Sequence, residues 1–477
     1  IRLLSHSVNP PHATKCIYIQ IVLNQVNTNR LQTQAVIIPA LVISFSYSRK
    51  ESDMHELIEL LSSDMKPALG VTEPGAIAYA VSTACSYLSG RAERVDLRLN
   101  SGIYKNAFTC GIPNSTHLGN LYAAALGAIA ANPELGLECL STVIPEDNTA
   151  AETMIKSGAI TAEVSEISSR IHIEAMVYCG DESATVIIRD SHTNISCIKH
   201  NGKVVMGNEH NDETRDDPLA VPIIHKYTLS DFVELIETVS YDDIAFIREA
   251  YAVNLALFDT AMASDRTTFA GSLFKKNGNK VISDNDVDTA SLLCNAAIEA
   301  RVLGLDAPAM SITGSGAHGI IATLPLYGYC KIHNIDEEKL LRATALSYLI
   351  CTYIKEYSGR LSAFCGCAIA AGSGMACALV YLDGGNVDDM RRCLNNMASS
   401  ITGMICDGGN HGCVMKGISA VDTAFRSKDF AISGICIENM HGINGATPED
   451  TMRNMGLIAS PGMVKTEETI LDIMKSK

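Results

Sequence analysis

The chain has 477 residues, of which 47% are hydrophobic, 5% are aromatic and none is Trp, and its net charge at pH 7 is −16. A chain of this length exceeds one small domain and can bury large cores. The acidic balance argues against nucleic acid and anionic membranes as partners, because both are bound through basic patches. Its sixteen cysteines are too dilute for a disulfide scaffold and predict a reducing, cytoplasmic environment.

The first 53 residues differ from the rest of the chain. They begin with Ile, contain no Met, and surround Asn9-Pro10-Pro11 with unpatterned polar and β-branched residues. The first Met is Met54, directly before the amphipathic stretch HELIELLSSDMKPALG. Residues 34–47 are apolar but shorter than the ~20 residues of a membrane helix. We therefore expect residues 1–53 to be a non-native, upstream-encoded or disordered extension.

Residues 54–225 predict a mixed α/β domain, which we expect to supply the substrate side of the active site. Apolar periodicity predicts helices at residues 54–66, 76–88, 121–131 and 146–157, and strands at 95–100, 171–179, 184–189, 194–200 and 203–206. Pro and Gly predict loops at 68–75 and across 101–120. Asn201-Gly202 is typical of a two-residue hairpin turn.

Residues 226–477 predict a mainly helical domain, so the expected fold class is α+β. After the N-cap Thr228, the pattern predicts helices at residues 231–240, 242–263, 290–304, 337–355, 361–382, 388–399 and 412–424. Residues 320–325 hint at a strand. The uncharged segment 361–382 has the length of a membrane span, but its Gly, Ser and three Cys residues favour a buried helix of a bundle.

Cys365, Cys406 and Cys413 form the candidate metal site. They lie in the motifs LSAFCGCAIAAG and GMICDGGNHGCVMKG. Thiolates are soft ligands that suit both iron–sulfur clusters and zinc. The surrounding glycines let the backbone approach closely and point N–H groups at an anionic cluster. The spacing alone leaves open a cluster, a zinc ion or ordinary buried thiols.

Six blocks carry a resemblance to a known family: KPALGVTEPGAIA, KNAFTCGIP, HTNISCIKHNG, GSGAHGIIATLP, GRLSAFCGCAIAA and GMICDGGNHGCVMK. Together they resemble the L-cysteine desulfidase family, which is related to the α subunit of iron–sulfur L-serine dehydratases. The similarity covers nearly all of the chain from Met54 onward. It implies a 4Fe–4S cluster with three cysteine ligands and one open iron, here Cys365, Cys406 and Cys413, with Cys367 as the substitute for Cys365.

The chain departs from the family pattern at two places. Val71 stands where the family block usually reads LGCTEP, and that family cysteine is thought to act in proton abstraction. A valine cannot serve as a base, an acid or a ligand, so another base acts, or the reaction differs, or activity is reduced. Ala317-His318 replaces the commoner Asn-Gln of the glycine turn, and a histidine can titrate near neutrality.

Lys105, His192 and His318 are the candidate catalytic residues. The spacing of His192 and Asn194 at a strand start predicts that both point to one face. They loosely resemble a His-x-Asn pair that binds substrate in serine dehydratases. Each candidate has a structural alternative: a solvated loop lysine, a turn with side chain to backbone bonds, and a histidine at a helix entry.

The remaining blocks supply candidate substrate contacts. Thr72 and Glu73 lie on a Pro- and Gly-bounded loop before a helix, where N–H groups can hold a carboxylate. Gly314-Ser315-Gly316 offers the same geometry. The predicted substrate-binding residues are Thr72, Glu73, Asn106, Asn194 and Ser315.

The resemblance implies a lyase that eliminates hydrogen sulfide or water from L-cysteine or L-serine, giving pyruvate and ammonia. No pyridoxal phosphate lysine motif is evident, which agrees with a metal in place of that cofactor. The expected partner is a small amino acid, with a homo-oligomer as an open possibility. Two alternatives stay open: a catalytically silent relative that keeps the cluster, and a zinc-binding protein that uses the same thiols.

Overall fold

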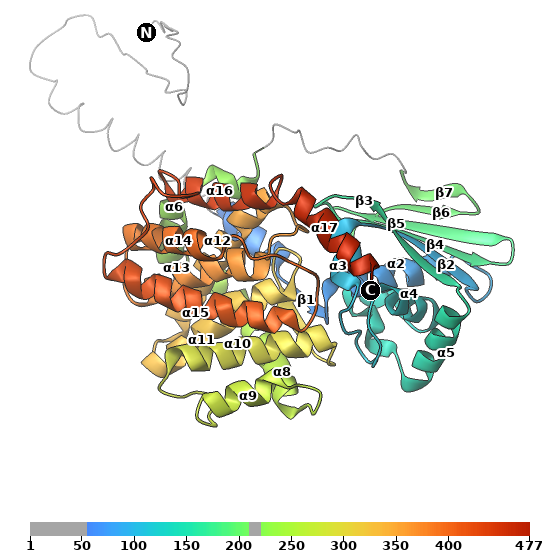
Figure 1. Ribbon diagram of the computed structural model, residues 1–477, viewed down its shortest axis with the longest axis horizontal. Coiled ribbons are helices and arrows are strands. Elements are labelled where there is room, and N and C mark those ends of the chain that lie inside the picture. Colours follow the sequence, from blue (N-terminus) through green and yellow to red (C-terminus); the bar gives the residue numbers. More distant parts are fainter. Residues whose placement is uncertain (1–54, 209–220) are drawn as a thin grey trace, which may run out of the picture. The chain divides into compact units, whose positions relative to one another are not determined.

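The computed structural model describes residues 55–208 and 221–477 (Figure 1). The predicted extension at residues 1–53 lies outside this part of the chain. Residues Leu57–Lys477 form one compact unit, and the predicted boundary near residue 225 stays a prediction. None of the helices in the described ranges combines the length and apolar character that crossing a membrane requires.

A six-stranded sheet occupies the first part of this unit. Its strands are β2 (Arg94–Asn100), β3 (Ile160–Glu166), β4 (His172–Cys179), β5 (Glu182–Arg189), β6 (Ile195–His200) and β7 (Lys203–Gly207). Their order is β3-β2-β4-β5-β6-β7, in which only β2 and β3 run parallel. The parallel strand β3, which had not been predicted, follows helix α5 (Pro145–Lys156).

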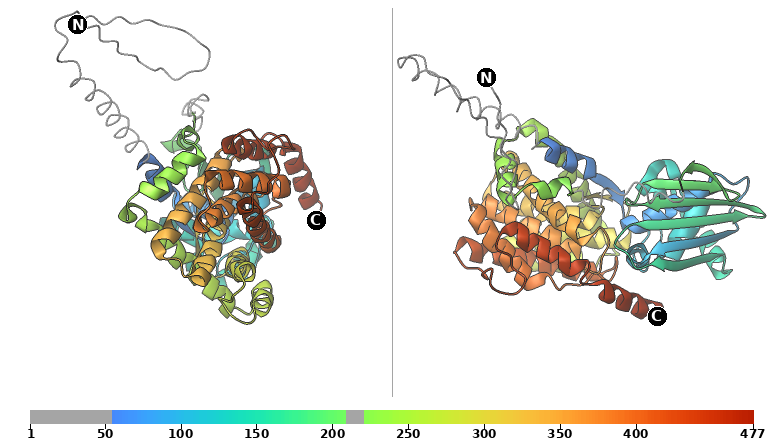
Figure 2. Two further views of the ribbon diagram at one scale, coloured as in Figure 1. Left: turned by 90° about the vertical axis from the view of Figure 1, so that its left-hand side faces the viewer. Right: turned by 90° about the horizontal axis from the view of Figure 1, so that it is seen from above.

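Helices α2 (Thr72–Cys85) and α4 (Asn120–Ile129) cover one face of the sheet (Figures 1 and 2). Buried and half-buried residues alternate along β4, as expected of a sheet with helices on one face only. Leu97, Ile173 and Val186 project from the strands into this core. The hairpin at Asn201 and Gly202 is confirmed, with both residues at positive φ.

The second part is helical, which confirms the α+β fold class. Its helices are α6 (Leu229–Thr238), α7 (Tyr241–Ile244), α8 (Arg248–Ala263), α9 (Phe269–Lys276), α10 (Asp286–Leu303), α11 (Gly316–His333), α12 (Glu337–Ser358), α13 (Gly372–Leu382), α14 (Val387–Ile401), α15 (Gly412–Ile432), α16 (Pro448–Ala459) and α17 (Val464–Lys475). Helices α10 to α13 are buried along most of their length. Helix α6 begins two residues earlier than predicted, directly after Thr228, which forms a capping box with Asp231.

Two predicted loops are wrong over part of their length. Residues 66–69 form strand β1 (Lys66–Leu69), which pairs antiparallel with β8 (Pro308–Ser311). Helix α2 then begins at Thr72, and Pro74 fits its first turn because N–H groups there have no partner within the helix. Residues 101–107 are the short helix α3 (Ser101–Ala107). Both errors concern the segments that build the site.

Two further expectations need correction. The strand hinted at residues 320–325 lies inside α11. The helix predicted from residue 361 begins only with a π-helical turn at Cys367–Ala371, followed by α13. Residues ahead of that turn are extended, since Phe364 forms an antiparallel bridge with Ile405. A π-helical turn of this kind is often found at functional sites.

Close packing of α13 on α12 gives a test of the helical core. A Cβ at Gly374 would overlap the carbonyl oxygen of Ser347, so Gly374→Ala is expected to destabilise the fold by about 1–3 kcal/mol through overpacking. The matched control is Gly271→Ala in α9, where nothing lies within 4 Å of the added Cβ. This control should stabilise by about 0.5–1 kcal/mol, because Ala is the better helix former. Chemical denaturation measures both, and equal effects would contradict the packing.

Candidate active site

A short backbone bridge holds two of the three candidate cysteines side by side. The Cys365 N–H donates to the Met404 carbonyl at 3.0 Å, and the Cys406 N–H donates to the Ala363 carbonyl at 2.6 Å. These bonds flank the Phe364–Ile405 bridge. Because side chains alternate between the faces of paired strands, Cys365 and Cys406 lie on the same face of this bridge.

Cys413 joins them from the first turn of α15. Its Sγ lies 3.6 Å from the Gly408 carbonyl oxygen, within the loop 406–413. Burial raises the pKa of the Cys413 thiol to about 11, and the charges of Cys406 and Cys365 act on it as well. The ammonium of Lys416, which pairs with Asp407, opposes these effects. The three thiols therefore share one electrostatic environment.

The described residues contain no group of three or more His, Cys, Asp or Glu side chains arranged to hold a single metal ion. Structural zinc needs four donors around one point, and the three thiols do not supply that. In a 4Fe–4S cluster the thiolates bind separate irons, so their sulfur atoms need not converge. Cys367 hydrogen-bonds to Cys365 and contributes most to raising the pKa of that thiol.

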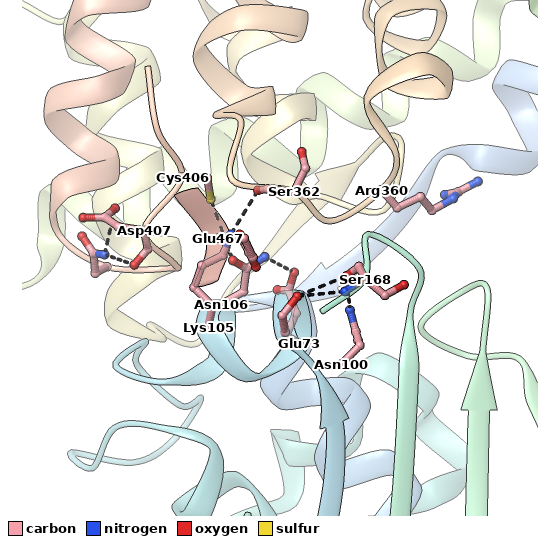
Figure 3. A network of polar contacts seen from close by, with 12 residues as sticks. Glu73, Asn100, Lys105, Asn106, Ser168, Arg360, Ser362, Cys406, Asp407 and Glu467 are labelled. Atoms are coloured by element: carbon pink, nitrogen blue, oxygen red, sulfur yellow. Dashed lines mark hydrogen bonds and ion pairs between the residues drawn. The ribbon is translucent and has the colours of Figure 1, made fainter. Parts of the chain in front are cut away.

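Asn106 links this thiol group to a buried carboxylate (Figure 3). Its Nδ2 donates to Glu73 Oε1 at 2.8 Å, and its Oδ1 accepts from the Cys406 Sγ at 3.8 Å. Glu73 is 5% exposed and lies in the first turn of α2. Burial by itself would raise the pKa of Glu73, but His192, Asn106 and Arg301 outweigh it and bring the pKa to about 2. Glu73 is therefore ionised.

His192 lies beside Glu73, whereas Asn194 does not. The His192 Nε2 is buried 3.8 Å from Glu73 Oε1, and within the described part of the chain it has no hydrogen-bond partner. Asn194 is exposed and its Nδ2 donates to the Arg189 carbonyl at 3.1 Å. The two residues lie in the turn between β5 and β6, so the expectation that both point to one face of a strand is wrong.

Lys105 is buried, and its ammonium is already engaged in an ion pair and a hydrogen bond. Its Nζ pairs with Glu467 Oε2 of α17 at 2.6 Å and donates to the Ser362 carbonyl at 3.0 Å (Figure 3). The Lys105 ammonium also opposes the rise in the pKa of Cys406 that burial causes. This lysine therefore connects α3, the cysteine-bearing segment and α17. Its neighbour Asn106 completes the same junction.

His318 and Ser315 are placed by the start of α11 (Gly316–His333). Thr313 Oγ1 and His318 Nδ1 share a hydrogen bond of 2.6 Å, and a Cβ at Gly366 would lie 2.7 Å from His318 Nε2. Burial, with the charges of Lys355 and Arg301, lowers the pKa of His318 to about 3, so the ring is neutral. Ser315 is the half-buried N-cap of α11.

Position 71 lies against the cysteine loop. Val71 is 2% exposed and directly precedes Thr72. A Cβ at Gly409 would lie 3.0 Å from its Cγ1, and Gly409 donates its N–H to the Asn106 carbonyl at 3.1 Å. The departure from the expected cysteine therefore falls inside the site. Its valine supplies shape but no chemistry.

Sequence reasoning assigned no role to two residues of this site, although Cys110 lies in the block KNAFTCGIP. Arg301, near the end of α10, is 4% exposed and its charge acts on both Glu73 and His318. Cys110 is buried, and its Sγ donates to the Ala107 carbonyl at 3.6 Å. In the sequence Arg301 lies in an apolar helical segment. A charged residue among such apolar neighbours is the one signal that could have identified it.

Comparison with known proteins places this arrangement in a family. Residues 134–472 match the profile described as serine dehydratase alpha chain. The chain belongs to the serine dehydratase alpha chain family. The matched span contains His192, Arg301 and the three cysteines, whereas Glu73 and Asn106 precede it. The part of the predicted resemblance that concerns serine dehydratases is thereby confirmed.

Curated relatives that align over nearly their whole length support this membership. A UPF0597 protein of Clostridium botulinum strain Langeland is 39% identical over 426 residues, covering 88% of this chain and 99% of the relative. One from Caldanaerobacter subterraneus is 35% identical over 425 residues, covering 89% and 99%. One from Desulfatibacillum aliphaticivorans is 34% identical over 429 residues, covering 88% and 98%. This member of the serine dehydratase alpha chain family thus aligns with nearly whole relatives.

The buried Lys105–Glu467 pair gives a test of how the site is held. Lys105→Met should destabilise the protein by about 3 kcal/mol, because it leaves the Glu467 carboxylate buried without its partner. Adding Glu467→Leu should restore most of the loss. The control Lys465→Met breaks the exposed Lys465–Glu468 pair and should change stability by less than about 1 kcal/mol. Unfolding in guanidinium measures the stability of all three variants. A double variant that is as unstable as Lys105→Met would contradict the proposed role of the ion pair.

Proposed function

We propose that the chain is an iron–sulfur-dependent lyase that eliminates water or hydrogen sulfide from L-serine or L-cysteine, giving pyruvate and ammonia. The observation that carries the proposal is the Asn106 side chain, which joins the Glu73 carboxylate to the Cys406 thiol. An elimination needs one group to take the α-proton and another to assist the leaving group. Membership of the serine dehydratase alpha chain family supports the same class of reaction.

Cys365, Cys406 and Cys413 would hold the 4Fe–4S cluster, with Cys367 as the substitute for Cys365. Their chemistry fits: three thiols of one environment, a glycine-rich loop at 406–413, and the ammonium groups of Lys105 and Lys416 to balance an anionic group. When bound, a cluster with an open iron supplies a Lewis acid that weakens the bond to the leaving group.

The residues of the chain itself divide the remaining work. His192 is our candidate for the α-proton, since its buried Nε2 has no hydrogen-bond partner among residues 55–208 and 221–477. Glu73, with a pKa of about 2, is too weak a base for that step but suits the substrate ammonium. Neutral His318 packs beneath Gly366 and helps to exclude water. The eliminated product tautomerises to an imine, which water hydrolyses.

Val71 supports a second candidate, a catalytically silent relative that keeps the cluster for a structural or redox role. The lyase and the silent relative would both carry the coloured cluster, so they differ in turnover and not in colour. A zinc protein would differ in both, because zinc leaves the protein colourless. We further propose a reducing cytoplasm as the compartment, which the high content of unpaired cysteines supports.

Anaerobic purification of the full chain tests the proposal. We expect a brown protein whose absorbance fades in air, with about four irons and four sulfides per chain, and release of pyruvate from L-serine or of pyruvate and sulfide from L-cysteine. Cys365→Ser should lose most of the iron, whereas Cys85→Ser, on α2 outside the site, should keep it. No turnover by intact, cluster-loaded protein would refute the lyase. A Val71→Cys variant that gains activity would indicate a decayed site.

His192 can be tested separately from the cluster. His192→Asn should lower kcat by about 10²–10⁴-fold, because it removes the group that takes the α-proton, while iron content stays unchanged. His333→Asn, at a half-exposed pair with Asp286, is the control and should keep the parent kcat. Steady-state kinetics under anaerobic conditions measure both. An unchanged kcat in His192→Asn would assign the base elsewhere.

A further inference from the structure

Arg301 is a buried cation that forms no ion pair in the described part of the chain. It is 4% exposed, and within the described ranges its Nε has no hydrogen-bond partner and its guanidinium no ion pair. A buried charge is unfavourable unless it is paired, and five N–H donors suit a planar carboxylate. An unpaired guanidinium in a buried site therefore indicates a missing anion.

The turn at residues 314–316 lies between Arg301 and His192. A Cβ at Gly316 would lie 2.8 Å from Arg301 Nε, and one at Gly314 would lie 3.3 Å from the His192 ring. The glycines therefore let both side chains pack closely against the turn. Helix α11 begins at this turn; the N–H groups of His318 and Gly319 donate to the Ser315 carbonyl, whereas those of Gly316 and Ala317 have no acceptor within the helix.

A hydroxyl and an opposite charge complete the surroundings. Thr72 is 2% exposed, and its Oγ1 has no partner among the residues that the structure describes. It adjoins Glu73, which lies 3.8 Å from His192 and is under the influence of the Arg301 charge. Glu73 and Arg301 thus form a buried anion and a buried cation in one site without an ion pair between them. A small zwitterion carries the complementary charges.

We propose that Arg301, with the Thr72 hydroxyl and the N-terminus of α11, binds the α-carboxylate of an amino-acid ligand, while Glu73 binds its ammonium. Arg301 then selects free amino acids over their amides and amines. The identity of this ligand as the substrate rests on the proposed lyase function. The anion site itself rests only on the buried, unpartnered donors.

L-Alanine is a suitable probe, because it has the α-carboxylate and ammonium of the proposed substrates but no leaving group. Isothermal titration of the anaerobically purified, cluster-loaded full chain should show L-alanine binding, with L-alaninamide and ethylamine at least tenfold weaker. Arg301→Met should weaken L-alanine binding by at least tenfold, and Arg301→Lys should recover part of it. Thr72→Val should weaken it by about 2–10-fold, the range for one hydrogen bond.

Controls separate binding from folding and from nonspecific anion effects. Arg266→Met, at an exposed arginine, should keep the parent affinity. If Arg301→Met fails to fold, the comparison of L-alanine with L-alaninamide on the parent protein and the Thr72→Val variant still decide. Equal affinity of parent and Arg301→Met, equal binding of L-alaninamide, or equal binding of chloride would each overturn the proposal.

The outcomes distinguish this proposal from the lyase proposal. Carboxylate-dependent binding without turnover would refute the lyase and keep the site. Turnover of L-serine or L-cysteine by Arg301→Met with an unchanged KM would refute the carboxylate role and keep the lyase.

Discussion

The contact between the end of α3 and the loop 406–413 is the constraint on which the site depends. The carbonyl of Asn106 accepts from the Gly409 N–H, and a Cβ at Gly409 would lie 3.0 Å from both that oxygen and Val71. Glycine favours this close approach, because an added Cβ would make a tighter contact than is usual. The same approach brings the Asn106 side chain between Glu73 and Cys406. This contact brings the Glu73 carboxylate and the Cys406 thiol, which are far apart in the sequence, into one site.

Buried charges set the character of the site. Lys105 has its counterion in Glu467, so this pair serves to attach α17 to α3. Glu73 accepts a hydrogen bond from Asn106 and lies 3.8 Å from His192, whereas Arg301 forms no ion pair with any residue that the structure describes. Charges that are paired hold a fold together, whereas buried charges left unpaired are unfavourable until a ligand supplies the partner. This difference separates the structural lysine from the residues that we assign to ligand binding.

The errors of the sequence-based prediction fall where tertiary contacts override local preference. Lys66-Pro67 and the glycines after it read as a loop, but pairing with β8 makes a strand of residues 66–69. The helix predicted from residue 361 starts late because Phe364 pairs with Ile405. In both cases the partner lies far away in the chain, and a local pattern contains no information about it. Helix α6, which begins with a local capping box, was predicted as a helix.

The periodicity of the sequence by itself predicted the α+β class, and its motifs, together with the family resemblance, predicted the three cysteines and the blocks that contain Glu73, Lys105 and His192, because residue type and short-range spacing carry these features. Only the tertiary structure decided which of these side chains are available. In the structure Lys105 pairs with Glu467, and Asn194 is exposed to solvent. His192 Nε2 has no hydrogen-bond partner in the described part of the chain, and Arg301 joins the candidate site residues. The physical reason is that hydrogen-bond partners and burial depend on residues brought together from distant segments, and no single segment contains them.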